Sequence, residues 1–91
     1  MDVNSAVKRA KEYVNNLFEG ESISDVGLEE VVFDEPSAAW EVTVGFARPW
    51  KRAQRSSFLP FDPPLLERDY KVVRVKDADG TIESVKIRQF K

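Results

Sequence analysis

The 91-residue chain contains neither cysteine nor histidine. These two absences remove the side chains that most often serve as a general base near neutral pH, as a thiolate nucleophile and as zinc ligands. Hydrolases whose catalytic triad uses histidine or cysteine are therefore excluded. Because small secreted domains usually compensate a thin core with disulfides, the lack of cysteine also indicates a reducing compartment.

Long apolar runs and glycine-rich loops are missing as well. The longest strongly apolar run covers residues 31–33, whereas a membrane-spanning helix needs about 18 residues or more. The basic residues near the N-terminus are not followed by the apolar stretch of a secretory signal. The four glycines are scattered along the chain, so no phosphate-binding loop is recognised. We therefore expect a cytoplasmic, non-catalytic protein that needs no cofactor and does not bind membranes.

Charge is unevenly divided along the chain, although the net charge is only −2. Residues 1–47 contain three basic and ten acidic side chains, and residues 48–91 contain eleven basic and six acidic ones. No basic residue occurs between Lys11 and Arg48. Such a division favours charged contacts, either within the fold or with a partner.

The N-terminal segment has the apolar spacing of a helix. Its apolar residues recur every three or four positions, at Val3, Val7, Ala10, Val14 and Leu17. This spacing predicts an amphipathic helix. Asp2 or Asn4 can cap its start, and Gly20 is expected to end it in the left-handed conformation that other residues avoid.

Four later segments have the composition of strands. Segment 28–33 is rich in β-branched and aromatic residues. Segment 40–47 alternates large apolar residues with small or polar ones, which predicts one buried and one wet face, with Trp40 in the core. Segments 70–76 and 81–88 flank Asp77-Ala78-Asp79-Gly80, a sequence typical of a tight hairpin.

These elements predict a single α+β domain over residues 1–91. The connections are too short for parallel crossovers, so the sheet is expected to be antiparallel. The predicted architecture is one N-terminal helix packed on a four-stranded antiparallel sheet, in the order α-β-β-(long loop)-β-β.

The long loop, residues 48–68, is the predicted functional site, because it exceeds the roughly 12 to 15 residues beyond which structureless loops are unusual. Its first half combines cations with an indole, at Arg48, Trp50, Lys51, Arg52 and Arg55. Its second half combines apolar anchors with three prolines that stiffen an extended chain; the anchors are Phe58, Phe61 and Leu65.

Two functions are open for this loop. The apolar half predicts docking to a protein partner, which includes a second copy in a homodimer, or else a cover for an open sheet face. The basic half can hold phosphates and stack on bases, so the alternative function is binding of single-stranded nucleic acid. We expect a protein-interaction or regulatory module that acts through residues 48–68.

The order of elements, together with the hairpin in segment 70–82, resembles the small PepSY-type and cystatin-like domains. In these domains a helix lies across an antiparallel sheet, and the resemblance implies a binding or inhibitory role. Segment 41–45 is similar to the cystatin hairpin motif Gln-x-Val-x-Gly. In this chain Glu41 stands where the motif has glutamine, and Thr43 where it has valine.

Overall fold

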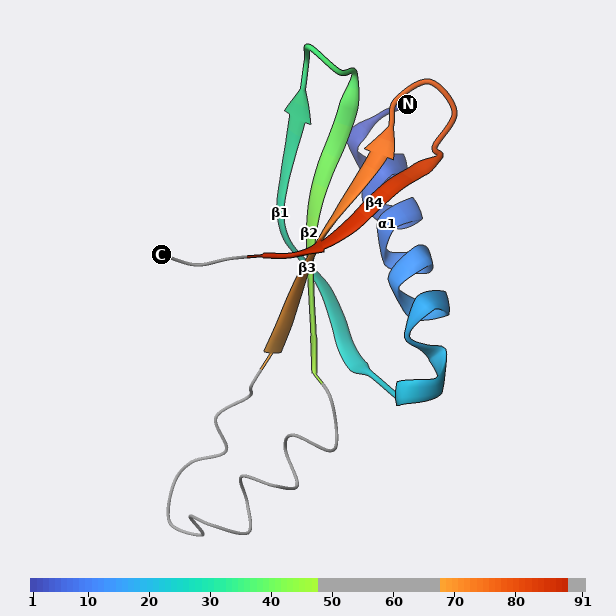
Figure 1. Cartoon of the computed structure of the whole chain (residues 1–91), viewed down its shortest axis with the longest axis vertical. Helices are drawn as coiled ribbons and strands as arrows, with labels where there is room; N and C mark the ends of the chain where they lie inside the picture. Colours follow the sequence, from blue (N-terminus) through green and yellow to red (C-terminus); the bar gives the residue numbers. More distant parts are fainter. Residues whose placement is uncertain (48–67, 89–91) are drawn as a thin grey trace, which may run out of the picture.

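A computed structural model of the chain describes residues 1–47 and 68–88. Helix α1 (Val3–Leu17) is followed by a short 3-10 helix, η1 (Glu19–Glu21), and by four strands, β1 (Ser24–Asp34), β2 (Ala39–Ala47), β3 (Arg68–Lys76) and β4 (Ile82–Ile87). The strands form one antiparallel sheet in the order β1-β2-β3-β4, and α1 packs against one face of it (Figure 1). The predicted α+β architecture and its order of elements are confirmed.

Helix α1 begins as the sequence indicates but ends differently. The carboxylate of Asp2 caps the helix by accepting a hydrogen bond of 2.7 Å from the amide of Ser5. The helix ends at Leu17, and the chain continues through η1 to Ser22, which has a φ of 51°. The prediction that Gly20 ends the helix is wrong, because the 3-10 turn ends it and Ser22 takes the left-handed conformation.

The core lies between α1 and the sheet. One row of valines runs across all four strands on the helix side, because paired residues of neighbouring strands point to the same face: Val31, Val42, Val73 and Val85. The helix adds Ala10 and Val14, both fully buried. Trp40, which was predicted to lie in the core, is half-buried and packs against the edge of this core.

The prediction of a wet face on β2 is wrong. Thr43 and Ala47 are only 3% and 2% exposed, and Gly45 is also buried. Strand β2 is central in the sheet, so side chains as small as these are shielded by longer neighbours on both sides. The guanidinium of Arg88 covers Thr43 directly, with Nη1 donating to Oγ1 over 3.0 Å.

The β2–β3 hairpin is the most regular part of the sheet. Every residue of β2 is paired, from Ala39 with Lys76 to Ala47 with Arg68, without a register shift. Arg68 therefore belongs to β3 and not to the predicted loop. The predicted hairpin after β3 is confirmed: Gly80 has a φ of 76°, and its amide donates to the carbonyl of Lys76 over 2.9 Å.

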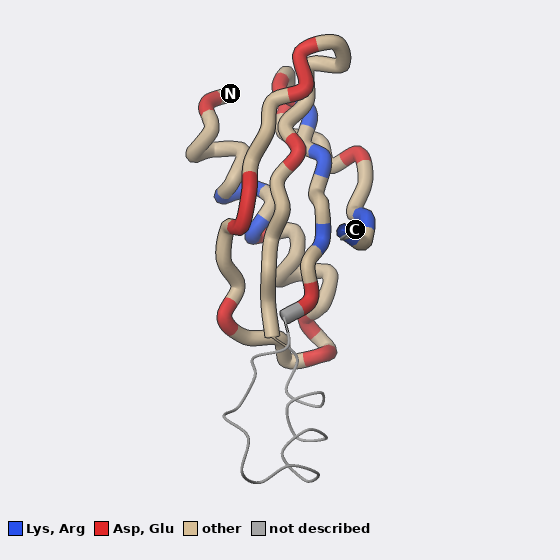
Figure 2. Tube along the Cα trace, turned by 90° about the vertical axis from the view of Figure 1, so that its left-hand side faces the viewer, with Lys and Arg blue, Asp and Glu red and all other residues tan. Residues whose placement is uncertain are grey.

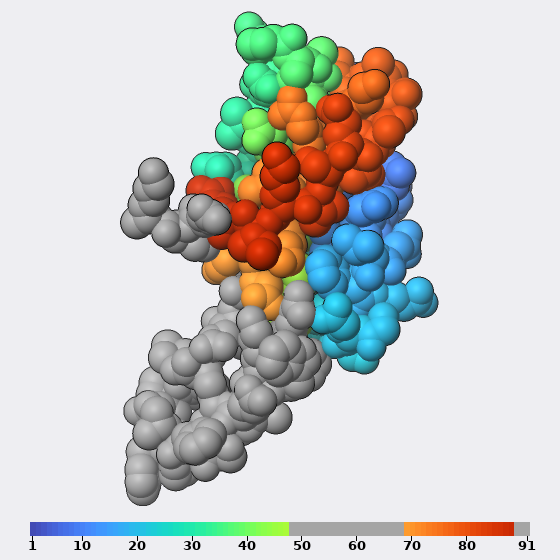
Figure 3. All heavy atoms as spheres, in the orientation of Figure 1, coloured from blue at the N-terminus to red at the C-terminus, as the bar shows by residue number. Residues whose placement is uncertain are grey.

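Strand β1 begins four residues earlier than the sequence predicts. Asp25 has a φ of 56°, and the pairing with β2 shifts register on both sides of the pair Gly27–Leu28. Because of these bulges, polar and apolar residues do not alternate strictly along β1. At the other edge, β4 crosses in front of β3, so the sheet is strongly twisted (Figures 1 and 3). Neither helix of the described residues has the length and apolar character needed to cross a bilayer.

Candidate functional site

The residues predicted from the sequence as the binding site lie outside the described residues. They are Arg48, Trp50, Lys51, Arg52, Arg55, Phe58, Phe61 and Leu65. The structure describes what flanks them, namely the paired residues Ala47 and Arg68 at the end of the β2–β3 hairpin. It brings together a different set of polar and apolar side chains on the sheet.

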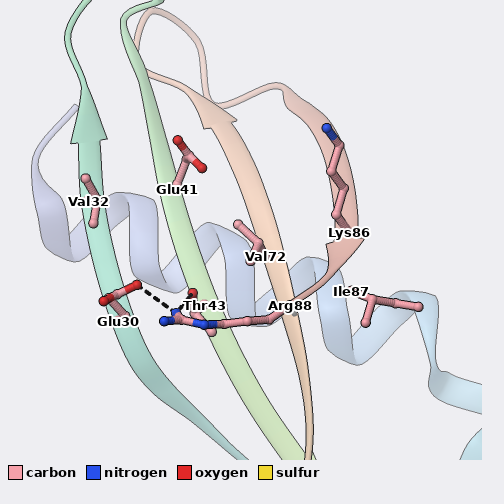
Figure 4. Close-up of a pocket in the computed structure, with 8 residues that line it drawn as sticks. All are labelled: Glu30, Val32, Glu41, Thr43, Val72, Lys86, Ile87 and Arg88. Carbon is pink, nitrogen blue, oxygen red and sulfur yellow. Dashed lines mark hydrogen bonds and ion pairs between the residues drawn. The ribbon is translucent and has the colours of Figure 1, made fainter. Parts of the chain in front are cut away.

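We call the side of the sheet away from α1 the open face. Two rows of paired residues cross it from β1 to β4. One row is Glu30, Thr43, Val72 and Lys86, and the next is Val32, Glu41, Arg74 and Ser84. The twist of the sheet curves this face into a hollow of about 580 Å³ (Figure 4). The hollow is lined by Glu30, Val32, Glu41, Thr43, Val72, Lys86, Ile87 and Arg88.

Arg88 spans one end of the hollow. Its side chain reaches from the residue after β4 across the sheet to β1, where Nη1 lies 2.7 Å from Oε1 of Glu30 (Figure 4). The same nitrogen donates to Oγ1 of Thr43 on β2. The two edge strands are thus joined by an ion pair across the open face.

Arg74 occupies the centre of a second charged group, which we call the Arg74 cluster. Its guanidinium lies 2.9 Å from the carboxylate of Asp34 and 3.4 Å from those of Glu41 and Glu83. The hydroxyl of Ser37 donates to Asp34 and accepts from Arg74. One cation therefore faces three carboxylates, which gives the cluster a net charge of −2.

Hydrogen bonds favour the ionised forms in the Arg74 cluster. The hydrogen bond from Ser37 and then the one from Arg74 hold the pKa of Asp34 below its ordinary value of 3.8. The hydrogen bond to Asp34 raises the pKa of Arg74, so this side chain stays positively charged. At neutral pH Asp34 is therefore ionised and has no proton to donate as an acid.

A third polar contact lies where the β3–β4 turn meets β2. The indole Nε1 of Trp40 donates to Oδ1 of Asp77 over 2.9 Å, and the amino group of Met1 lies 3.2 Å from the same oxygen. These bonds, the first from Trp40, lower the pKa of Asp77. The ring of Trp40 also packs on Phe33, with centroids 4.8 Å apart. Trp40 thus links the core to β1.

Strand β1 exposes more large apolar surface than any other described strand. Leu28, Val32 and Phe33 are 43%, 51% and 37% exposed. Viewed from the β1 side, the acidic residues of this strand are seen with no basic residue among them (Figure 2). An exposed edge strand with apolar side chains on both faces is a surface on which a further chain can pair.

Within residues 1–47 and 68–88, no group of three histidine, cysteine, aspartate or glutamate side chains is placed to hold a metal ion. Neither the open face nor the β1 edge was predicted from the sequence. The alternation in segment 40–47 did contain a signal, because it puts Glu41 on the face away from the core. Arg74 and Arg88 carry no local signal, since their partners are far away in the sequence.

Comparison of the chain with protein-family models, with curated proteins and with solved structures finds no match. The candidate site therefore rests on its own geometry. Segment 41–45, which resembles the cystatin motif, lies inside the central strand β2, where Val42 and Val44 are fully buried.

Proposed function

We propose that this chain is a non-catalytic protein-interaction module. The observation that carries the proposal is the exposure of Leu28, Val32 and Phe33 on one edge strand. An edge strand presents unpaired backbone donors and acceptors, and proteins usually blunt it with lysine, proline or short length. Strand β1 is 11 residues long and contains neither lysine nor proline, and its bulges lie before Glu30, so the rest of the edge is regular.

The ionisable groups of the described residues support a binding role over a catalytic one. A carboxyl group that acts as a general acid near neutral pH needs a raised pKa. The carboxyl groups with resolved shifts are Asp2, Asp34, Asp77 and Asp79, and the pKa of each is lowered by hydrogen bonds. Asp2 caps helix α1, Asp34 and Asp77 accept hydrogen bonds from side chains on β3 and β2, and Asp79 closes the β3–β4 turn.

The predicted loop, without Arg68, which belongs to β3, remains a second proposed binding surface, for a protein partner or for a second copy of this chain. It rests on the sequence, and the regular β2–β3 hairpin supports it by fixing Ala47 and Arg68 side by side. Light scattering after size-exclusion chromatography tests the homodimer. Replacing Phe58, Phe61 and Leu65 by serine should convert such a dimer to a monomer, and a wild-type monomer contradicts the homodimer.

The resemblance to PepSY-type and cystatin-like domains agrees with a binding role. The proposal does not include protease inhibition, because the segment similar to the cystatin motif lies in the central strand β2, where Val42 and Val44 are fully buried. Binding of single-stranded nucleic acid through residues 48–55 stays an alternative from the sequence. No described residue favours that alternative.

Affinity capture from an extract of the source cells tests the proposed function. The wild-type chain should retain a protein in stoichiometric amount. The variant Val32→Lys, which puts a charge on β1, should lose it, and the control Ile87→Lys should keep it. Ile87 is 70% exposed on β4, so the same charge is added to the other edge. Captures that contain no stoichiometric protein would contradict the proposal.

A further inference from the structure

One part of the β1 edge is free of bulges. Residues from Glu30 to Asp34 pair one by one with β2, from Thr43 to Ala39, after the register shift that precedes Glu30. Bulges protect the edge nearer the N-terminus of β1, because they disrupt the row of backbone groups. Residues 30–34 keep a regular row, long enough to pair with a strand of about five residues.

The side chains of this segment alternate between the two faces. Val31 and Phe33 pair with Val42 and Trp40 on the helix side, and Val31 packs against the core. Val32 lies on the open face and is 51% exposed. A strand added here would therefore extend an apolar surface on both faces of the sheet.

Carboxylates lie at both ends of the apolar run. The side chains of Glu30 and Asp34 are 52% and 32% exposed. Arg88 bonds Oε1 of Glu30, whereas Arg74 and Ser37 bond Oδ2 of Asp34. Within the described residues the second oxygen of each carboxylate accepts no hydrogen bond, and a carboxylate can accept several.

The surrounding charge is negative. Between residues 24 and 35 there are five acidic side chains and no basic one. Asp34 also belongs to the Arg74 cluster, in which Glu41 and Glu83 are two further carboxylates around a single cation. An incoming strand with cations near both ends of its apolar run would complement this charge.

A second copy of β1 does not fit the same edge. Antiparallel pairing centred on Val32 would place Glu30 of one copy opposite Asp34 of the other, at both ends of the pair. Like charges directly opposite one another destabilise a sheet. In this register a second copy of β1 is disfavoured, and a strand of opposite charge is favoured.

We infer that residues 30–34 of β1 accept an extended segment of another protein by strand addition. This inference rests on the proposed function. The segment carries a lysine or arginine on each side of three apolar or β-branched residues, which lie opposite Val31, Val32 and Phe33. The cations pair with Glu30 and Asp34 on the open face.

The test uses the full chain, labelled for NMR, and a short capped peptide in which two lysines flank three β-branched residues. Titration to about 1 mM covers the weak affinity expected of so short a strand. Amide shifts and slowed amide exchange should be confined to β1 around residues 30–34. A matched peptide with glutamates in place of the lysines should bind about tenfold more weakly.

Variants of the chain complete the test. Val32→Lys should abolish binding of the lysine peptide, and Ile87→Lys should leave it unchanged. Equal binding of both peptides, protection on another strand, or a dimer of the free chain that protects residues 30–34 would overturn the inference. If the lysine peptide leaves β1 unaffected but a captured protein is still lost from Val32→Lys, the inference fails and the proposed function stands. If the lysine peptide leaves β1 unaffected and Val32→Lys still retains the captured protein, both the inference and the proposed function fail.

Discussion

Nη1 of Arg88 lies 2.7 Å from Oε1 of Glu30, so the end of β4 is joined to the opposite edge of the sheet. The residues are 58 positions apart, and the bond crosses the open face above Thr43. This ion pair lies at one end of the hollow and holds the carboxylate at the start of the regular β1 edge.

The variant Arg88→Gln tests this cross-sheet bond. Glutamine is shorter than arginine and carries no charge, so the variant cannot form the ion pair with Glu30. Because exposed ion pairs contribute about 0.2–1 kcal/mol, global stability should fall by no more than that. Amide exchange should accelerate locally at the end of β4 and at Glu30. Lys86→Gln, two residues earlier on β4 and with no ion-pair partner among the described residues, is the control and should leave these amides unchanged.

The Arg74 cluster predicts a pH-dependent stability. The folded-state pKa of Asp34 is lowered, so its contribution is complete above the ordinary value of 3.8 and is lost as the pH falls through the folded value. In Arg74→Met the three carboxylates repel one another. Its thermal midpoint should lie a few degrees below wild type at pH 7, and the gap should narrow below about pH 4.

Thermal unfolding followed by circular dichroism from about pH 7 to pH 3 provides the measurement. Lys86→Met removes a cation from the same face and should shift the midpoint less at every pH. A constant gap between Arg74→Met and wild type over this range contradicts the assigned role of the ionised carboxylates.

The bond from Trp40 to Asp77 predicts a titrating indole signal. Because the pKa of Asp77 is lowered, the proton resonance of the Trp40 indole N–H should shift with a midpoint below pH 3.8. The variant Trp50→Phe identifies the signal, since the chain has two tryptophans. Asp77→Asn should remove the titration. A midpoint at or above 3.8 would show that the carboxylate does not accept this bond.

Two valines on neighbouring strands provide a matched test of burial. Val42 on β2 is fully buried, whereas Val32 on β1 is 51% exposed. Val42→Ala leaves a cavity and should lower the free energy of unfolding by about 1–3 kcal/mol. Val32→Ala should cost less than about 1 kcal/mol. Urea unfolding measures both, and equal losses would mean that Val32 is covered in solution.

The nucleic-acid alternative makes a quantitative prediction. If Arg48, Lys51, Arg52 and Arg55 all contact phosphates of a single strand, the logarithm of affinity should fall with the logarithm of salt at a slope of about −3. Fluorescence polarisation with mixed single-stranded oligomers measures it. No binding at low salt ends this alternative.

Local sequence patterns were sufficient to predict the architecture. The alternation of residues 40–47 identified β2, and its parity correctly assigned Val42, Val44 and Phe46 to the core. The apolar spacing of residues 3–17 identified α1, and Gly80 identified the last hairpin. Each of these features depends on residues that are close together in the sequence, so a local pattern is enough to predict it.

Features that depend on the whole sheet were not predicted. The burial of Thr43 requires that β4 twist far enough for Arg88 to reach across β2 and β3. The Arg74 cluster requires the register of β1, β2, β3 and the β4 edge together. The exposed β1 edge follows from strand order, which the sequence constrains only through connection lengths. The predicted binding residues in the loop stay predictions.

We propose that β1 is the surface through which this chain binds another protein. Amide exchange measured on the full chain, free and with its captured partner, tests this role of β1. We predict that the amides around residues 30–34 exchange more slowly in the complex. Unchanged exchange on β1, with protection appearing elsewhere in the chain, would contradict the claim.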